Sequence, residues 1–192
     1  MKARLTILSL LISLAFTLYL PQPVISLQAR DHLTPQEVEL VKNTQILDKR
    51  IDVFIKAADR RVMALTGNSG TNARQLKKDS ETWGDLPAGT HAELMSDIAR
   101  IFDEAITNID DVSSRDEKNP LIAKSLRKIA AAATRIVEQL KPFAVASKGG
   151  SEVSSFDQLI ENADAIIQAA NKLPPEVAKK DKAKGEKRKD SN

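Results

Sequence analysis

The feature that most constrains this chain is the recurrence of apolar residues at helical spacing in four successive blocks, of which residues 34–65 form the first. One arc of its helical wheel is apolar, with the members Leu40, Leu47, Ile51, Phe54, Ile55, Ala58, Val62 and Leu65. Thr34 and Glu37 match a capping box around Pro35, and Gly67 stands where a left-handed residue ends a helix. We therefore predict one long N-terminal helix over this block.

Three later blocks repeat the pattern. The second opens with another capping box, Thr90 with Glu93. The predicted segments are residues 90–112, 120–142 and 154–173, preceded by a short polar helix over 73–82. The predicted fold class is all-α: an antiparallel four-helix bundle with one long N-terminal helix and a short extra helix in the first connection.

Charge separates the second and third of these main helices. Residues 90–112 carry six acids against Arg100, whereas residues 120–142 carry five bases against Glu138. Opposite charge and a short connection favour packing of these two helices as an antiparallel pair.

The ends of the chain differ from this helical domain, residues 27–175. Residues 1–26 combine the basic Lys2 and Arg4 with an uncharged apolar run, which is typical of a signal peptide. We expect cleavage and a periplasmic or secreted location; an uncleaved N-terminal membrane anchor is the alternative. The chain has no Cys, so an exported form has no disulfide to support its packing.

The net charge of +3 comes from the two terminal segments, because the segment between them is slightly acidic. We therefore expect no nucleic-acid partner. Residues 176–192 hold seven bases and four acids and almost nothing apolar, which predicts a disordered basic tail. Weak contact with anionic envelope surfaces is one role for this tail, and a solubilising role is the other.

Catalytic and cofactor motifs are scarce. The sequence lacks Glu-x-x-His, Cys-x-x-Cys-His, His-Glu-x-x-His and Gly-x-Ser-x-Gly motifs, and we predict no cofactor. His91 and Met95 stand one helical turn apart and are candidate ligands for a soft metal such as Cu(I). The alternative places His91 at the end of the bundle beside Trp83, the single tryptophan, as a packing residue.

Acidic residues also line one flank of the first predicted helix. Asp48, Asp52 and Asp59 could serve acid–base chemistry in a cleft, or pair with a neighbouring helix as flanking charges do. We favour interhelical pairing. If this region is an interaction surface, its members are Asp48, Arg50, Asp52, Lys56, Asp59, Arg61 and Trp83.

Two segments carry a family resemblance. The run Leu33-Thr34-Pro35-Gln36-Glu37, followed by DKRIDVFIK at residues 48–56, resembles segments of exported bacterial proteins, chiefly of soil lineages, that have no assigned activity. The resemblance implies a compartment and no chemistry.

These observations favour a non-enzymatic role, as a protein-interaction or scaffold module of the cell envelope, with a protein partner or self-association. One alternative is a small-ligand or soft-metal carrier at the bundle end near His91, Met95 and Trp83. A second alternative is a hydrolase that uses the row of Asp residues.

Overall fold

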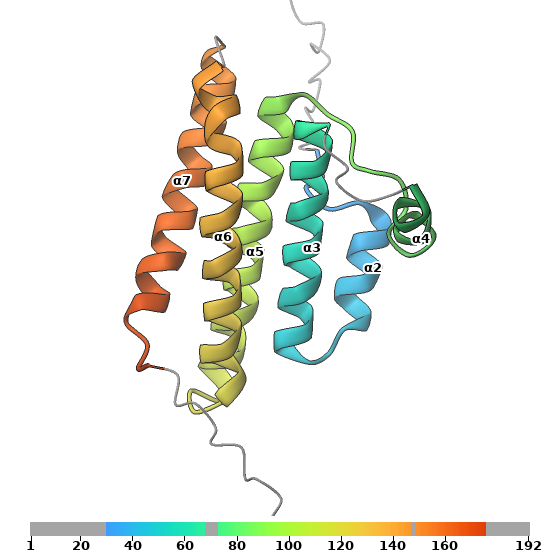
Figure 1. Cartoon of the computed structure of the whole chain (residues 1–192). Helices are drawn as coiled ribbons and strands as arrows, with labels where there is room; N and C mark the ends of the chain where they lie inside the picture. Colours follow the sequence, from blue (N-terminus) through green and yellow to red (C-terminus); the bar gives the residue numbers. More distant parts are fainter. Residues whose placement is uncertain (1–29, 68–72, 147–148, 176–192) are drawn as a thin grey trace, which may run out of the picture. The chain divides into compact units, whose positions relative to one another are not determined.

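The chain folds into helices, shown in Figure 1. The computed structural model describes residues 30–67, 73–146 and 149–175, and the described helices belong to the unit Asp31–Asn192. Their bounds are α2 (Pro35–Asn43), α3 (Leu47–Thr66), α4 (Ala73–Trp83), α5 (His91–Arg115), α6 (Pro120–Ala146) and α7 (Gly150–Asn171). The all-α fold class is confirmed. The predicted signal peptide and basic tail lie outside the described residues.

The long N-terminal helix is wrong, because the chain breaks between Asn43 and Leu47. The short helix α2 turns and lies beside α3, as Figure 1 shows. Thr44 is extended at the break, with ψ 98°, and its hydroxyl donates to the Leu40 carbonyl. Arg50 donates to the Thr44 carbonyl from the first turn of α3. The turn is thus closed by side chains and contains neither Gly nor Pro.

Four helices surround the main core. The helix α3 packs on α5 and α6, and α7 packs on the same two helices from the other side (Figure 1). Phe54, Phe102, Ile136 and Leu159, one from each helix, are fully buried. Val38 and Val41 of α2 pack against this core at its margin. The predicted apolar stripes therefore point inward, although Leu40 and Ile55 are only partly buried.

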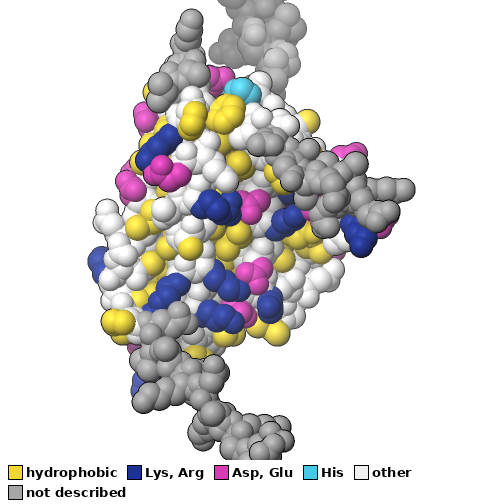
Figure 2. All heavy atoms as spheres, viewed as in Figure 1, with side chains coloured by type: hydrophobic (Ala, Val, Ile, Leu, Met, Phe, Trp, Pro, Cys, Tyr) yellow, Lys and Arg dark blue, Asp and Glu magenta, His cyan; other side chains and the backbone are white. Residues whose placement is uncertain are grey.

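Three of the five cations of α6 contact acids of α3, which corrects the expectation that they meet the acids of α5. Lys124 pairs with Asp48, Lys128 with Asp52 and Arg135 with Asp59, and the two members of every pair are 76 residues apart. A constant offset requires two parallel helices in fixed register. Figure 2 shows Lys and Arg side chains interleaved with Asp and Glu on the face over α3 and α6.

Several predicted boundaries are confirmed and two are wrong. Both capping boxes form, the short helix α4 is present, and Gly67 is left-handed with φ 60°. By contrast, α6 continues past Pro142, although a proline at this position removes the hydrogen bond to the Glu138 carbonyl, and α7 begins four residues before Ser154. Within the described part of the chain, no helix has the length and apolar character needed to cross a bilayer.

Candidate functional site

A buried polar cluster lies between α2, α3 and the end of α4. Glu37, in the first turn of α2, is completely buried. Its Oε1 accepts from Arg60 Nε at 3.1 Å and from Arg61 Nη1 at 2.6 Å, and its Oε2 accepts from the Thr34 backbone N–H at 2.9 Å. The two arginines are also buried. One carboxylate therefore caps α2 and joins it to α3.

Arg60 extends this cluster to α4. Its Nη2 donates to the backbone carbonyls of Trp83, Gly84 and Asp85 at 3.1, 3.1 and 2.5 Å. These carbonyls follow the last turn of α4, where the helix dipole favours a cation. The Trp83 ring adds a cation–π contact, with its centroid 5.9 Å from Arg60 Cζ. Arg60 thus connects the N-terminal turn of α2, through Glu37, to the C-terminal end of α4.

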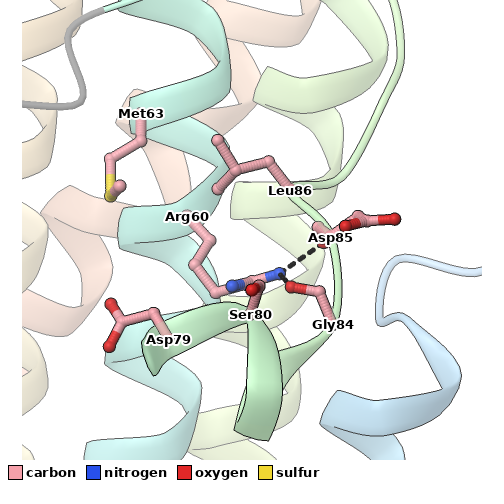
Figure 3. Close-up of a pocket in the computed structure, with 7 residues that line it drawn as sticks. All are labelled: Arg60, Met63, Asp79, Ser80, Gly84, Asp85 and Leu86. Atoms are coloured by element: carbon pink, nitrogen blue, oxygen red, sulfur yellow. Dashed lines mark hydrogen bonds between the residues drawn. The ribbon is translucent and has the colours of Figure 1, made fainter. Parts of the chain in front are cut away.

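A hollow of about 420 Å³ opens beside Arg60. Figure 3 shows Met63 and Leu86 on one side of the guanidinium and Asp79 and Ser80 on the other. Asp79 accepts from Lys56 Nζ at 2.7 Å and Arg60 pairs with Glu37, while the exposed Asp85 is a third charged residue in the lining. The hollow is therefore a partly apolar cleft in which two of the three charged side chains already have partners.

Arg61 reaches the opposite side of the cluster. Its Nη2 donates to the His32 carbonyl at 2.6 Å, and its Nε lies 4.0 Å from Asp97 Oδ2 of α5. The His32 ring in turn lies 2.6 Å from Glu104 Oε2. These contacts hold the segment before α2 against α5. Arg61 is 1 % exposed and is therefore excluded from the predicted interaction surface.

The row of acids on α3 is engaged by α6. Asp48 is buried and accepts from Lys124 Nζ at 2.5 Å, while Asp52 and Asp59 accept from Lys128 at 2.7 Å and Arg135 at 2.8 Å. The hydrogen bond from Lys124 lowers the pKa of Asp48, against the opposing effect of burial. Acid–base catalysis near neutral pH needs a raised carboxyl pKa, so the Asp48 geometry favours interhelical pairing.

Two further cations of the predicted surface also bind side chains of neighbouring helices. Arg50 Nη1 donates to Asn108 Oδ1 of α5 at 2.9 Å, and Lys56 binds Asp79 of α4. Trp83 is half-buried against Arg60. The predicted residues therefore tie α3 to α4, α5 and α6, and they do not form one continuous outward patch.

His91 and Met95 lie one turn apart on α5 but differ in burial. Met95 is 1 % exposed, in the core, whereas the His91 side chain is half-exposed. The His91 ring meets Phe143 edge-on at 6.5 Å, and its Nδ1 lies 4.0 Å from Glu152 Oε1. His91 thus packs against α6 and α7, in place of the predicted contact with Trp83. Among the described residues, no group of three or more His, Cys, Asp or Glu side chains is arranged to hold a metal ion.

A surface that the sequence reasoning missed lies along α5 and α7. The two helices together carry ten acids and two arginines, and α7 itself contains no Lys or Arg. Six of these acids are exposed and lack an ion-pair partner in the described part of the chain: Asp103, Asp110, Asp111, Asp157, Glu161 and Asp164. We call this set the acidic face. The last predicted block, residues 154–173, contains Lys172 as its single base, and this scarcity of bases was the signal that could have found it.

An apolar groove lies within the acidic face. Its hollow of about 160 Å³ is lined from α5 by Phe102, Asp103 and Ile106, and from α7 by Asn162, Ala165, Ile166 and Ala169. Phe102 and Ile166 are buried and form the floor, while Ala165 is exposed. Two alanines one turn apart leave room that larger side chains would fill. We call this hollow the α5/α7 groove.

Comparison with protein-family models, with curated proteins and with solved structures found no match for this chain. The fold and the sites described above define it as an all-helical protein with paired charges between α3 and α6, and with six carboxylates on α5 and α7 that have no ion-pair partner among the described residues.

Proposed function

We propose that this chain is a non-enzymatic, exported protein-interaction or scaffold module of the cell envelope. The observation that carries the proposal is the acidic face, whose six carboxylates have no ion-pair partner among the described residues. The charges of α3, by contrast, are largely matched by neighbouring helices. A surface of unmatched charge beside apolar side chains is suited to recognising a partner of opposite charge.

We propose a four-helix antiparallel bundle of α3, α5, α6 and α7 as the scaffold. Helices consecutive in the chain reverse direction, and the parallel contact of α3 with α6 is then a contact between alternate members. The 76-residue offset of the three ion pairs supports this arrangement. In this bundle α5 and α7 are neighbours on the side opposite α3 and α6. The arrangement of the four helices therefore accounts for the position of the acidic face.

Site-specific photo-crosslinking tests the interaction role. A photo-crosslinking residue placed at Ala165, in the α5/α7 groove, should give a defined protein adduct in cells that express the full chain. The matched control is Ala131, an exposed alanine on α6, which should give no such adduct. Absence of adducts at both positions, together with a monomer in analytical ultracentrifugation, would remove the proposal.

The carrier hypothesis has weaker support and a different location. The hollow beside Arg60 is partly apolar, through Met63 and Leu86, and lies next to Trp83 in the chain. An apolar ligand bound there should change Trp83 fluorescence and raise the melting temperature by mass action. An unchanged melting temperature on titration would reject it. The geometry does not support the hydrolase hypothesis, because all three of its carboxylates accept hydrogen bonds from cations.

A further inference from the structure

The α5/α7 groove combines two features that together specify a partner. It offers a concave apolar floor, Phe102 and Ile166, between two neighbouring helices. Carboxylates flank it on both helices, with Asp103 on α5 and Glu161 and Asp164 on α7. From these observations we infer that the groove binds a cationic amphipathic helix of a partner protein; this inference rests on the proposed interaction function.

The volume of the groove fits an apolar anchor. An apolar cavity of about 150 Å³ accommodates a benzene molecule, so the 160 Å³ hollow can receive one large aliphatic or aromatic side chain. Helices bind such grooves by inserting apolar residues from successive turns of one face. Ala165 and Ala169 are small, which lets the partner backbone approach α7 closely.

The acidic face favours a partner of positive charge. The six exposed carboxylates of the acidic face attract Lys or Arg side chains placed on the two flanks of an inserted helix. Asp157 lines a second hollow on α7, of about 470 Å³, together with Glu161 and Asp164. The negative charge thus continues along α7 beyond the apolar hollow, as binding of an extended helix requires.

The chain supplies a competing occupant for the groove, its own residues 176–192. This segment is basic and begins five residues after the end of α7 in the sequence. It has almost no apolar residues and so cannot fill an apolar floor, although it matches the acidic face in charge. The geometry therefore favours a separate helix that carries both apolar and basic side chains.

Peptide binding to the full chain tests this inference. The probe is a labelled Lys/Leu amphipathic peptide of about 18 residues, long enough to lie along α7, and its binding is measured by fluorescence anisotropy. A scrambled peptide of equal composition keeps the charge and removes the apolar face. We expect the amphipathic peptide to bind at least about ten-fold more tightly than the scrambled one, and more weakly as salt rises and the Debye length falls.

Matched variants locate the binding site. Ala165→Lys places a cation in the groove and should weaken binding about ten-fold or more through a repulsive contact. Ala131→Lys adds the same charge on α6 and should change the affinity little. Asp164→Asn should weaken binding about two- to five-fold, whereas Glu81→Gln, an exposed acid of α4, should not. Circular dichroism checks that every variant remains helical.

Four results would overturn the inference. Equal affinity for the scrambled peptide would show charge attraction without a groove. Unchanged binding by the Ala165→Lys variant would place the peptide elsewhere. A gain of about ten-fold on removing residues 176–192 would show that the tail occupies the groove, and salt-sensitive dimers abolished by Ala165→Lys would assign it to a second copy.

The outcome also separates this inference from the proposed function. Photo-crosslinks from another surface, with no peptide binding at the groove, would reject the groove and keep an interaction protein. Absence of peptide binding and of all crosslinks would reject both.

Discussion

Replacement of Glu37 by Gln should destabilise the fold far more than a single change of charge on a helix normally does. The carboxylate is completely buried, and its two oxygens accept from Arg60, Arg61 and the Thr34 N–H. An amide offers one acceptor oxygen, so either the arginines or the Thr34 N–H lose their acceptor. Arg60 also loses its buried counter-charge, and Arg61 keeps only Asp97, whose Oδ2 lies 4.0 Å from its Nε.

The expected cost follows from these contacts. Removing one partner of a buried ion pair costs about 3–5 kcal/mol. Arg60 keeps its three carbonyl acceptors, and Arg61 keeps the carbonyls of His32 and Ala57, so the loss should lie near the lower end of this range. A loss of about 3 kcal/mol corresponds to a decrease of roughly 10 °C in melting temperature for a domain of this size.

Urea unfolding followed by far-UV circular dichroism measures the effect, and Glu39→Gln is the matched control. Glu39 lies on the same helix, is exposed, and pairs with Lys42 at 3.1 Å. Its replacement should cost less than about 0.5 kcal/mol. If Glu37→Gln cost no more than Glu39→Gln, the buried carboxylate would not be what holds α2 against α3, and our account of the helix break would be refuted.

Three further predictions concern other parts of the fold. Because the folded-state pKa of Asp48 lies below its ordinary 3.8, its contribution to stability is present above that pH and is lost as pH falls through the folded pKa. The urea midpoint of the Asp48→Asn variant should thus depend less on pH below about 4 than that of the unchanged chain, and equal slopes would contradict this. A double-mutant cycle of Asp59→Ala and Arg135→Ala should give a coupling of about 0.2–1 kcal/mol, because both side chains are partly exposed; a coupling above about 2 would show a buried pair. Gly67→Ala should cost about 1–2 kcal/mol in urea unfolding, since Gly67 is left-handed with no steric contact for a Cβ, and a neutral result would mean that the helix end rearranges.

The sequence predicted those helix ends that local chemistry determines. Thr34 with Glu37 and Thr90 with Glu93 form their capping boxes, and Gly67 ends α3. These signals act within one turn of the chain, so a reader of the sequence sees all of their parts. The apolar stripes were predicted for the same reason, since their period depends on the local conformation alone.

The break at Thr44 was not predictable in this way, because its cause is distant. In an unbroken helix, Glu37 and Arg60 would be about 35 Å apart at 1.5 Å per residue, and the pair could not form. The capping box already explained Glu37, so nothing local indicated that its second oxygen binds two arginines. The apolar spacing also continues across the break and conceals it.

Charge predicted that helices pair but not which helices pair. The acids of α3 and of α5 were both suitable partners for Lys124, Lys128 and Arg135, and only the packing order decides between them. The acidic face was missed because α5 was thereby assumed to be neutralised by α6. The acidic face could be recognised only once the structure showed that these cations of α6 pair with α3.

The common offset of the three α3–α6 ion pairs makes the two helices sensitive to changes in chain length. An insertion or deletion between Asp48 and Asp59 would shift one side of the ladder past the other and rotate the following apolar residues out of the core. Length changes in the connections between α3 and α6 leave both helices intact. Descendants of the same ancestral sequence should therefore keep acids at intervals of four and seven in one helix and bases at the same intervals in the other, even where the intervening segments have diverged in size.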